Sequence, residues 1–322
     1  MAPSRRSPTR LLAVCFALLT LAVSAAGCAS SGSGGTGRTT APAEIKPVAA
    51  SGRKLSVIAT TTQIADFLHN VGGDHVEVTD LIAAGQDPHE FEPKPGDVQR
   101  LNSADIIFKN GAGLESSFTR FLNNVPRAVP IVDASRGVKL RKEGATVDPH
   151  IWHDPTNAKI MVNNLRDALI KRDPAGAASY QEAALSYTQQ IDRLEGQTQA
   201  MFDAVPREKR KLVTNHDAFG YFVARYGIDF VGSVIPSLDT NSEPSAKDTQ
   251  ALIKRIKDQH VCAIFTESSV NPRLEQQIAA DAGVKVYSNL YGDTLGPPGS
   301  DGDTYLKMEA SNAKNMAAGM SC

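Results

Sequence analysis

The sequence predicts an α/β protein of two lobes, each with a mostly parallel β-sheet flanked by helices, joined by one long rigid α-helix. Short apolar segments rich in β-branched residues alternate with helical patterns in the first half of the chain, and the same alternation returns in the second half. A longer helical pattern without strands separates the two series. With 322 residues, 41% of them hydrophobic, the chain is long enough to bury the cores of two such lobes.

The first lobe is expected to span residues 54–173. Its apolar segments have the length of strands and are separated by helical patterns such as QIADFLHNV and FTRFLNNV, which is typical of a parallel sheet. We predict its strands at residues 54–61, 75–82, 104–111 and 129–135. The second lobe, residues 205–322, repeats this pattern. We predict its strands at residues 211–216, 228–235, 261–268 and 284–290.

Residues 174–204 predict the long connecting helix. Mostly apolar side chains recur there at alternating spacings of four and three residues, which places them on one face of a helix. They are Tyr180, Ala184, Tyr187, Ile191, Leu194, Thr198 and Met201. A coiled coil would show the same stripe, but the run is short and Gly196 interrupts it. A rigid helix packed on the preceding helix, residues 156–172, is therefore the better interpretation.

The first 27 residues have the pattern of a secretory signal. Three arginines precede an apolar run at residues 11–23, which is shorter than the roughly 20 residues of a membrane-spanning helix, and small residues follow it. The segment Ala25-Ala26-Gly27-Cys28 resembles the lipobox of bacterial lipoproteins, which implies acylation of Cys28; a chance thiol in a secreted protein is the alternative. Residues 28–53, rich in Gly, Ser and Thr, would then be a lipidated flexible tether.

Charge and cysteine content indicate which classes of partner and which cellular compartment to expect. Removal of residues 1–27 leaves 31 basic and 35 acidic residues, so no nucleic-acid partner is expected. We expect a monomer on the outer face of the cell membrane. Cys262 and Cys322 are then available for a structural disulfide in an oxidising compartment. A buried Cys262 and a terminal free thiol at Cys322 are the alternatives.

Two related segments, QDPHEFEP (residues 86–93) and VDPHIWHDP (residues 147–155), concentrate polar chemistry. Loops beyond the carboxyl ends of parallel strands converge on one crevice, and four candidate ligands lie in such positions. They are His89, His150, His216 and Asp293. Three imidazoles and one carboxylate are enough to complete a tetrahedral zinc shell. Each residue alone also fits a simpler role, such as a helix cap or, for Asp293, an Asx-turn.

Three further positions have less specific predictions. His153 could support the site, act as an alternative ligand or be exposed to solvent, and we favour exposure because four ligands already suffice. Glu267, at the end of a predicted strand, could orient a ligand or cap the helix near Pro272. Trp152 is expected to pack the loop. The remaining histidines are expected at the surface, dispensable for metal binding: His69, His75 and His260.

The ordered motifs TTTQIADFLHNVGGD, DPHEFEP, ADIIFKNGAGLE, DPHIWHDP, VTNHDAFGYF, FTESS and GDT resemble the metal-specific solute-binding lipoproteins of bacterial ABC importers. The resemblance covers essentially the whole mature chain. It implies two α/β lobes, one metal clamped between them by His89, His150, His216 and Asp293, and a membrane permease as partner. His153 departs from the family motif, in which an apolar residue usually stands.

The resemblance implies zinc as the first choice of metal and manganese as the second. His216 resembles the third ligand of zinc-binding members, whereas manganese-binding members commonly have glutamate there. Residues 136–147 contain no histidine, although many zinc-binding members carry a histidine-rich loop. We therefore expect capture of a divalent metal outside the cytoplasm and delivery to a permease, because the chain has no P-loop of its own.

Two other functions fit parts of the pattern. A secreted zinc hydrolase would use three histidines as ligands and Asp293 as a catalytic base. The chain has no H-E-x-x-H or G-x-S-x-G motif, and a fourth protein ligand closes the zinc shell, so we do not expect an enzyme. Surface adhesion, which has been described for lipoproteins of this family, is compatible with transport.

Overall fold

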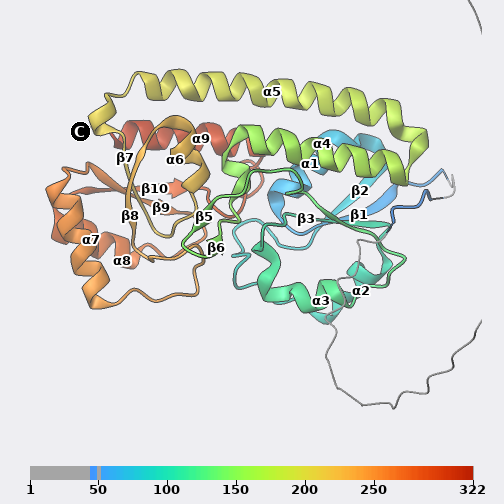
Figure 1. Cartoon of the computed structure of the whole chain (residues 1–322), viewed down its shortest axis with the longest axis horizontal. Helices are drawn as coiled ribbons and strands as arrows, with labels where there is room; N and C mark the ends of the chain where they lie inside the picture. Colours follow the sequence, from blue (N-terminus) through green and yellow to red (C-terminus); the bar gives the residue numbers. More distant parts are fainter. Residues whose placement is uncertain (1–43, 49–51, 322) are drawn as a thin grey trace, which may run out of the picture. The chain divides into compact units, whose positions relative to one another are not determined.

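The structure is a computed structural model that describes residues 44–48 and 52–321 (Figure 1). The predicted signal segment, Cys28, most of the predicted tether and Cys322 lie outside the described residues. None of the helices in the part of the chain that the structure describes is long and apolar enough to cross a membrane.

The first lobe contains a four-stranded parallel sheet with the order β2-β1-β3-β4. Its strands, all within predicted segments, are β1 Leu55–Ala59, β2 Val76–Asp80, β3 Ile106–Lys109 and β4 Ile131–Asp133. The helices between them are α1 Thr62–Gly72, α2 Pro95–Ser103 and α3 Thr119–Asn123. The side chain of Thr61 accepts a hydrogen bond from the amide of Ile64, which caps α1 directly after β1.

The second lobe contains two parallel strand pairs, β7 with β8 and β9 with β10, and β7 lies beside β9. All four strands again lie within predicted segments: β7 Lys211–Thr214, β8 Asp229–Ser233, β9 Ala263–Glu267 and β10 Lys285–Leu290. The accompanying helices are α6 Gly220–Tyr226, α7 Ala246–Asp258 and α8 Arg273–Ala282. Two lobes, each with parallel strands flanked by helices, are confirmed.

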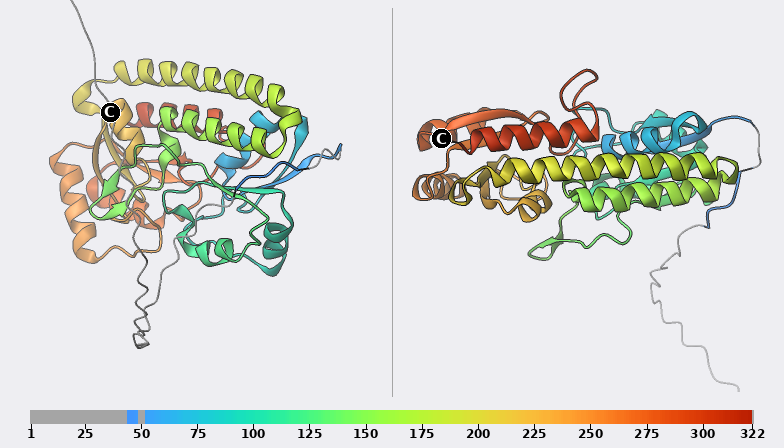
Figure 2. Two further views of the ribbon diagram at one scale, coloured as in Figure 1. Left: turned by 45° about the vertical axis from the view of Figure 1, so that its right-hand side comes forward. Right: turned by 90° about the horizontal axis from the view of Figure 1, so that it is seen from above.

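Three long helices cover both lobes (Figure 2). They are α4 Pro155–Arg172, α5 Ala177–Asp203 and α9 Tyr305–Gly319. The connecting helix α5 packs against α4, as predicted, and also against α1 and α9. The predicted stripe is buried except at its end, where Phe202 is buried instead of Met201. Gly196 faces open space, so the helix continues through it without a break.

The C-terminal part of the chain returns to the first lobe. Tyr291, Leu295, Tyr305 and Met308 are buried in the same apolar cluster as residues of α1, α4 and the first sheet. The segment between β10 and α9 therefore crosses the junction between the lobes.

A short antiparallel hairpin was not predicted. Strands β5 Lys142–Glu143 and β6 Thr146–Val147 pair around Gly144, whose φ of 59° is the left-handed conformation that glycine favours. The hairpin extends from the helices as seen in Figure 2. It leads directly into the second Asp-Pro-His sequence.

Two terminal segments contact the folded lobes. The amide of Val48, in the stretch expected to be a tether, donates to the carbonyl of Arg172 at 2.8 Å, so residues 44–48 are bound to the end of α4. Near the other end, the sulfur of Cys262 lies 3.6 Å from the carbonyl oxygen of Met320. The disulfide with Cys322 stays a prediction because Cys322 lies outside the described residues.

Candidate metal centre

The four predicted ligands come together at the junction of the lobes. His89, His150, His216 and Asp293 are buried, and one potential ligand atom of each lies within 4.8 Å of the others. Nε2 of His150 lies 3.3 Å from both Nε2 of His89 and Oδ1 of Asp293. Oδ2 of Asp293 lies 3.4 Å from Nε2 of His216 and 3.6 Å from Nε2 of His89. All three imidazoles therefore offer Nε2, and the carboxylate directs both oxygens into the cluster.

The repeated Asp-Pro-His sequence forms the same local turn twice. In the first Asp-Pro-His loop (residues 87–89), Oδ1 of Asp87 accepts the amide hydrogen of His89 at 2.8 Å. In the second Asp-Pro-His loop (residues 148–150), Oδ1 of Asp148 accepts the amide hydrogen of His150 at 3.0 Å. Both are Asx-type turns, in which a short acidic side chain fixes the backbone two residues later. The repeated sequence thus holds the backbone of both histidines with the same hydrogen bond.

Asp148 supports the ring of His150 as well as its backbone. Oδ1 of Asp148 lies 2.9 Å from Nδ1 of His150, which leaves Nε2 to face the cluster. Burial lowers the pKa of His150, but the hydrogen bonds and charges of Asp148 and Asp293 outweigh it and raise the pKa to about 9. The sequence analysis missed Asp148, although its place in the repeated motif was a usable signal.

Glu267 supports His216 in the corresponding way. Its Oε1 lies 2.8 Å from Nδ1 of His216, and both side chains are fully buried. Burial lowers the pKa of His216, but the charges of Glu267 and Asp293 raise it well above the usual value. The close approach depends on Gly292, since an added Cβ would lie 1.9 Å from Oε2 of Glu267. Of the two predicted roles for Glu267, contact with a candidate ligand is the one observed.

Asp293 is held by the first lobe although it follows β10. Its carbonyl oxygen accepts a hydrogen bond from Nε2 of Gln63 at 3.0 Å, and the amide of Leu295 donates to Oγ1 of Thr62 at 2.8 Å. Burial raises the pKa of Asp293, but the neighbouring His216 and His89 outweigh it and hold the pKa well below its usual range. The N-terminal turn of α1 therefore positions a carboxylate that stays ionised.

His89 is the most exposed member of the cluster, at 8%. A loop of the second lobe holds its backbone: Oγ1 of Thr240 donates to Oδ2 of Asp87 at 2.6 Å, and Nδ2 of Asn241 donates to the carbonyl of His89 at 3.4 Å. The sequence analysis did not identify Asp87, Thr240 and Asn241 as supports of this loop.

The carboxyl group of Asp217, which follows His216 in the chain, also has a shifted pKa. Burial together with the charge of Asp148 raises the pKa of Asp217 to about 6.

The prediction that His153 is exposed was wrong. Its side chain is fully buried, and Nδ1 lies 2.7 Å from Oε1 of the buried Glu309 on α9. The side chain is not a member of the four-residue cluster. The residue ends a short 3₁₀ turn, Ile151–His153, and its ring is covered by Glu309 of α9 and by Phe219. Trp152 packs the loop as expected and donates from Nε1 to the carbonyl of Gly292 at 3.1 Å.

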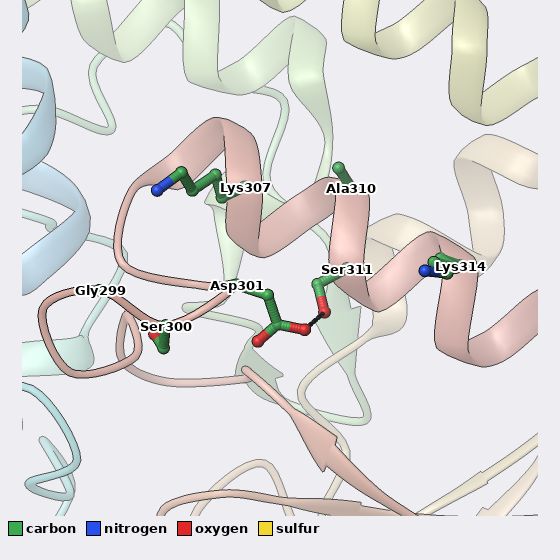
Figure 3. Close-up of a pocket in the computed structure, with 7 residues that line it drawn as sticks. All are labelled: Gly299, Ser300, Asp301, Lys307, Ala310, Ser311 and Lys314. Atoms are coloured by element: carbon green, nitrogen blue, oxygen red, sulfur yellow. Dashed lines mark hydrogen bonds between the residues drawn. The ribbon is translucent and has the colours of Figure 1, made fainter.

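The predicted surface position of three other histidines is confirmed. His69, His75 and His260 are exposed. A shallow pocket of about 480 Å³ lies elsewhere, between α9 and the loop before it (Figure 3). Its charged side chains are already partnered in part, because Lys307 pairs with Asp303 at 2.8 Å and Ser311 donates to Asp301 at 2.8 Å. None of the four clustered residues lines it.

Comparison with known proteins identifies the family of the chain. Residues 57–319 match the model of the family described as zinc-uptake complex component A, periplasmic. The chain belongs to this family. It is 32% identical to the manganese ABC transporter substrate-binding lipoprotein PsaA of Streptococcus anginosus, over 86% of this chain and 92% of the relative. It is 30% identical to the manganese-binding lipoprotein MntA of Halalkalibacterium halodurans, over 96% and 99%.

Solved structures show the same fold. The periplasmic zinc-binding protein TroA from Treponema pallidum has a TM-score of 0.80 at 30% identity, with 84% of this chain and 100% of that chain covered. A manganese-bound periplasmic metal-binding protein from Candidatus Liberibacter asiaticus has a TM-score of 0.76 at 25% identity, covering 83% and 100%. The chain is therefore a metal-binding substrate-binding protein of an ABC transporter and not an enzyme. The hydrolase alternative is excluded.

Proposed function

We propose that this chain captures one divalent transition metal outside the cytoplasm with His89, His150, His216 and Asp293, and that zinc is the preferred cargo. The observation that carries the proposal is the spacing of the ligand atoms. Tetrahedral zinc with bonds of about 2.0–2.1 Å requires ligand atoms about 3.3–3.4 Å apart. Four of the distances between the ligand atoms are close to this value, at 3.3, 3.3, 3.4 and 3.6 Å, and one ligand atom of each residue lies within 4.8 Å of the others.

The donor set supports zinc over manganese. Imidazole nitrogen suits zinc, whereas carboxylate, carbonyl and water oxygens suit manganese, and this cluster has three nitrogens to one carboxylate. Four protein ligands also fill a tetrahedral shell, so no position stays open for a reactive water. A closed shell favours capture and transport.

Manganese is the second candidate, on two observations. The relatives cited above are named for manganese. In addition, both carboxylate oxygens of Asp293 face the histidines, Oδ1 at 3.3 Å from Nε2 of His150 and Oδ2 at 3.4 Å from Nε2 of His216, so both are available as oxygen donors beside the three imidazoles. A shell of more than four donors with additional oxygen is closer to the preference of manganese.

Delivery requires a partner and a location. The family consists of substrate-binding components of metal uptake systems, which implies a permease that receives the ion. We propose that the acylated Cys28 anchors the chain at the outer face of the membrane and that residues between Cys28 and the first lobe give it reach. Acylation is tested by mass spectrometry of the N-terminal fragment of the mature protein, which should carry lipid on Cys28 and none after Cys28→Ser.

Metal analysis tests the proposed site. The purified mature chain is stripped with a chelator, reloaded with equimolar zinc and manganese, and its metal is counted. We expect one ion per chain, mostly zinc, lost in His216→Ala but retained in His75→Ala, an exposed histidine outside the cluster. A chain that takes up no stoichiometric metal, or a His216→Ala variant that keeps it, would overturn the assignment. One manganese ion in place of zinc would support the second candidate.

A further inference from the structure

The buried pair of His153 and Glu309 has no place in the four-ligand site. His153 is 0% and Glu309 2% exposed, and Nδ1 of His153 lies 2.7 Å from Oε1 of Glu309. A buried carboxylate next to a ring nitrogen fixes the proton on Nδ1 and makes it the donor. Nε2 of His153 and Oε2 of Glu309 have no hydrogen-bond partner among the described residues. The interaction is thus a single, directional bond inside an apolar region.

His153 is rigidly connected to the candidate ligand His150. His150 is the N-cap of the 3₁₀ turn that His153 ends, and the amide of His153 is 3.4 Å from the carbonyl oxygen of His150. Residues three apart in a 3₁₀ turn lie on the same side of it. A displacement of the His153 ring would therefore move the turn from which His150 reaches the cluster.

The same ring contacts the segment that carries His216. The centroid of His153 lies 4.4 Å from that of Phe219, with 31° between the ring planes. Phe219 is fully buried and follows His216 by three residues at the start of α6. His153 follows His150 by three residues, just as Phe219 follows His216 by three. Two ligand-carrying loops meet through these two rings.

Glu309 links His153 to α9, the helix that follows the segment carrying Asp293. It lies in α9, one turn after Tyr305, and the chain between Asp293 and α9 is anchored to the first lobe. Two other hydrogen bonds join the same elements: Nε1 of Trp152 donates to the carbonyl of Gly292 at 3.1 Å, and Oη of Tyr305 donates to the carbonyl of Trp152 at 2.8 Å. His153 contacts both this region, through Glu309, and the segment that follows His216, through Phe219.

We infer that His153 is a positioning residue of the metal centre, which through Glu309 and Phe219 fixes the segments that carry His150, His216 and Asp293 relative to one another. The inference rests on the proposed function of these residues as ligands. A purely structural role would be served at least as well by an apolar ring, because a buried polar pair loses its hydration and an apolar replacement of similar volume is often as stable. What the apolar ring lacks is the directional bond to α9.

The test uses the full mature chain with cadmium-113 as an NMR probe and zinc competition as the affinity assay. In His153→Phe, the ring volume and the contact with Phe219 are kept and the bond to Glu309 is lost. We expect the zinc dissociation constant to rise about tenfold, the lower end of the range for outer-shell changes, and the cadmium resonance to shift. His75→Phe, the same substitution at an exposed site, should leave both unchanged.

Glu309 provides the second arm if His153→Phe fails to fold. Glu309→Gln keeps an oxygen that accepts from Nδ1 and should retain the affinity, whereas Glu309→Leu should behave like His153→Phe. The double variant His153→Phe with Glu309→Leu should be no weaker than either single variant, because the two act through one bond.

Unchanged affinity and cadmium resonance in Glu309→Leu or in a folded His153→Phe would overturn the inference, even if urea unfolding showed lower stability, because that result describes a structural role. Failure of the proposed function has a different signature: a wild-type chain that holds less than one cadmium, or a His216→Ala chain that keeps it, would overturn both.

Discussion

The two Asp-Pro-His loops begin with the same turn and then differ in what surrounds them. In the second loop, Oδ1 of Asp148 contacts both the amide and the ring of His150, which is fully buried. In the first loop, Asp87 uses one oxygen for the amide of His89 and the other for Thr240 of the second lobe. One sequence motif therefore produces two environments: in the second loop the aspartate supports the histidine ring, and in the first loop the aspartate bonds to the second lobe instead.

This difference assigns different tasks to the two loops. The second loop is connected to its surroundings through Trp152, His153 and the hydroxyl of Tyr221, which donates to the carbonyl of Asp148 at 3.1 Å. The first loop has the more exposed histidine and a polar contact with a loop that has no regular secondary structure. We therefore expect the second loop to determine affinity and the first loop to determine how fast the ion enters and leaves.

The largest expected effect is the loss of a ligand from the second loop. His150→Ala removes one donor and leaves Asp148 and Asp293 as buried carboxylates without their common partner. Zinc affinity should fall by more than about 100-fold, beyond the range of outer-shell changes. His89→Ala should cost less, because water can reach the more exposed position. Competition with a chromophoric chelator measures both; a smaller loss for His150→Ala would contradict the ranking.

Replacing each of the two aspartates by asparagine separates the effect of the charged contact with the ring from the effect of the turn. Asparagine keeps an oxygen for the amide hydrogen, so Asp148→Asn and Asp87→Asn both retain the turn. Asp148→Asn should lower zinc affinity by about 10–100-fold because the charged partner of His150 Nδ1 is lost. Asp87→Asn should not cause a comparable loss, since the carboxylate of Asp87 bonds to the amide of His89 and to Thr240 and not to the ring of His89. Equal losses in the same chelator assay would contradict this prediction, because both variants keep the turn and only Asp148 contacts a histidine ring.

A pH dependence of the metal-free protein follows from the second loop. The pKa of His150 is raised to about 9, so between about pH 6.5 and 9 the folded chain holds a proton that the unfolded chain has lost. Stability from this group is therefore complete below about pH 6.5 and decreases as pH rises through 9, with a slope of at most about 1.4 kcal/mol per pH unit. His216, whose pKa is also raised, acts in the same direction.

Urea unfolding of the metal-free chain at several pH values measures this slope. Asp148→Asn should reduce it, because the hydrogen bond and charge of Asp148 contribute to the raised pKa. Zinc-loaded protein should lack the loss above pH 6.5, since the metal replaces the proton on the ring nitrogen. A metal-free wild-type chain whose stability is constant from pH 6.5 to 9 would refute the protonated state of the site.

The fold was predictable where the sequence has one dominant periodicity. All eight predicted strands exist because short β-branched runs such as VCAIF leave no helical alternative, and the stripe from Tyr180 to Thr198 identifies α5. The hairpin around Gly144 was missed because its two-residue strands carry no periodicity, although a glycine in a polar run was a signal. The packing of Tyr305 and Met308 into the first lobe was not predictable, because it depends on how distant segments meet.

The four clustered residues were predictable because two of them share the Asp-Pro-His motif and three follow strands of parallel sheets, whereas His150 follows the antiparallel hairpin that was not predicted. Their supports were harder to identify. Glu267 could be inferred from its place at the end of a strand, but the partner of His153 is Glu309, 156 residues away, and no local pattern connects them. The exposure predicted for His153 was wrong because a polar side chain in a polar motif gives no indication that a distant helix covers it.

The smallest expected effect concerns the contact that is peculiar to the first loop. Thr240→Val has nearly the same volume but removes the hydroxyl that donates to Asp87, a partly buried bond that contributes about 0.5–1.5 kcal/mol. Because the bond joins the His89 loop to the second lobe, its loss should speed zinc dissociation several-fold. Stopped-flow capture of the released zinc by a chelator measures this rate. The number of metal ions bound per chain should not change. Thr249→Val is the matched control, since that hydroxyl bonds to Ser245 at the start of its own helix, α7. If both variants release zinc at the wild-type rate, the first loop opens without breaking this contact, and the division of tasks between the two loops would have to rest on the exposure of His89 alone.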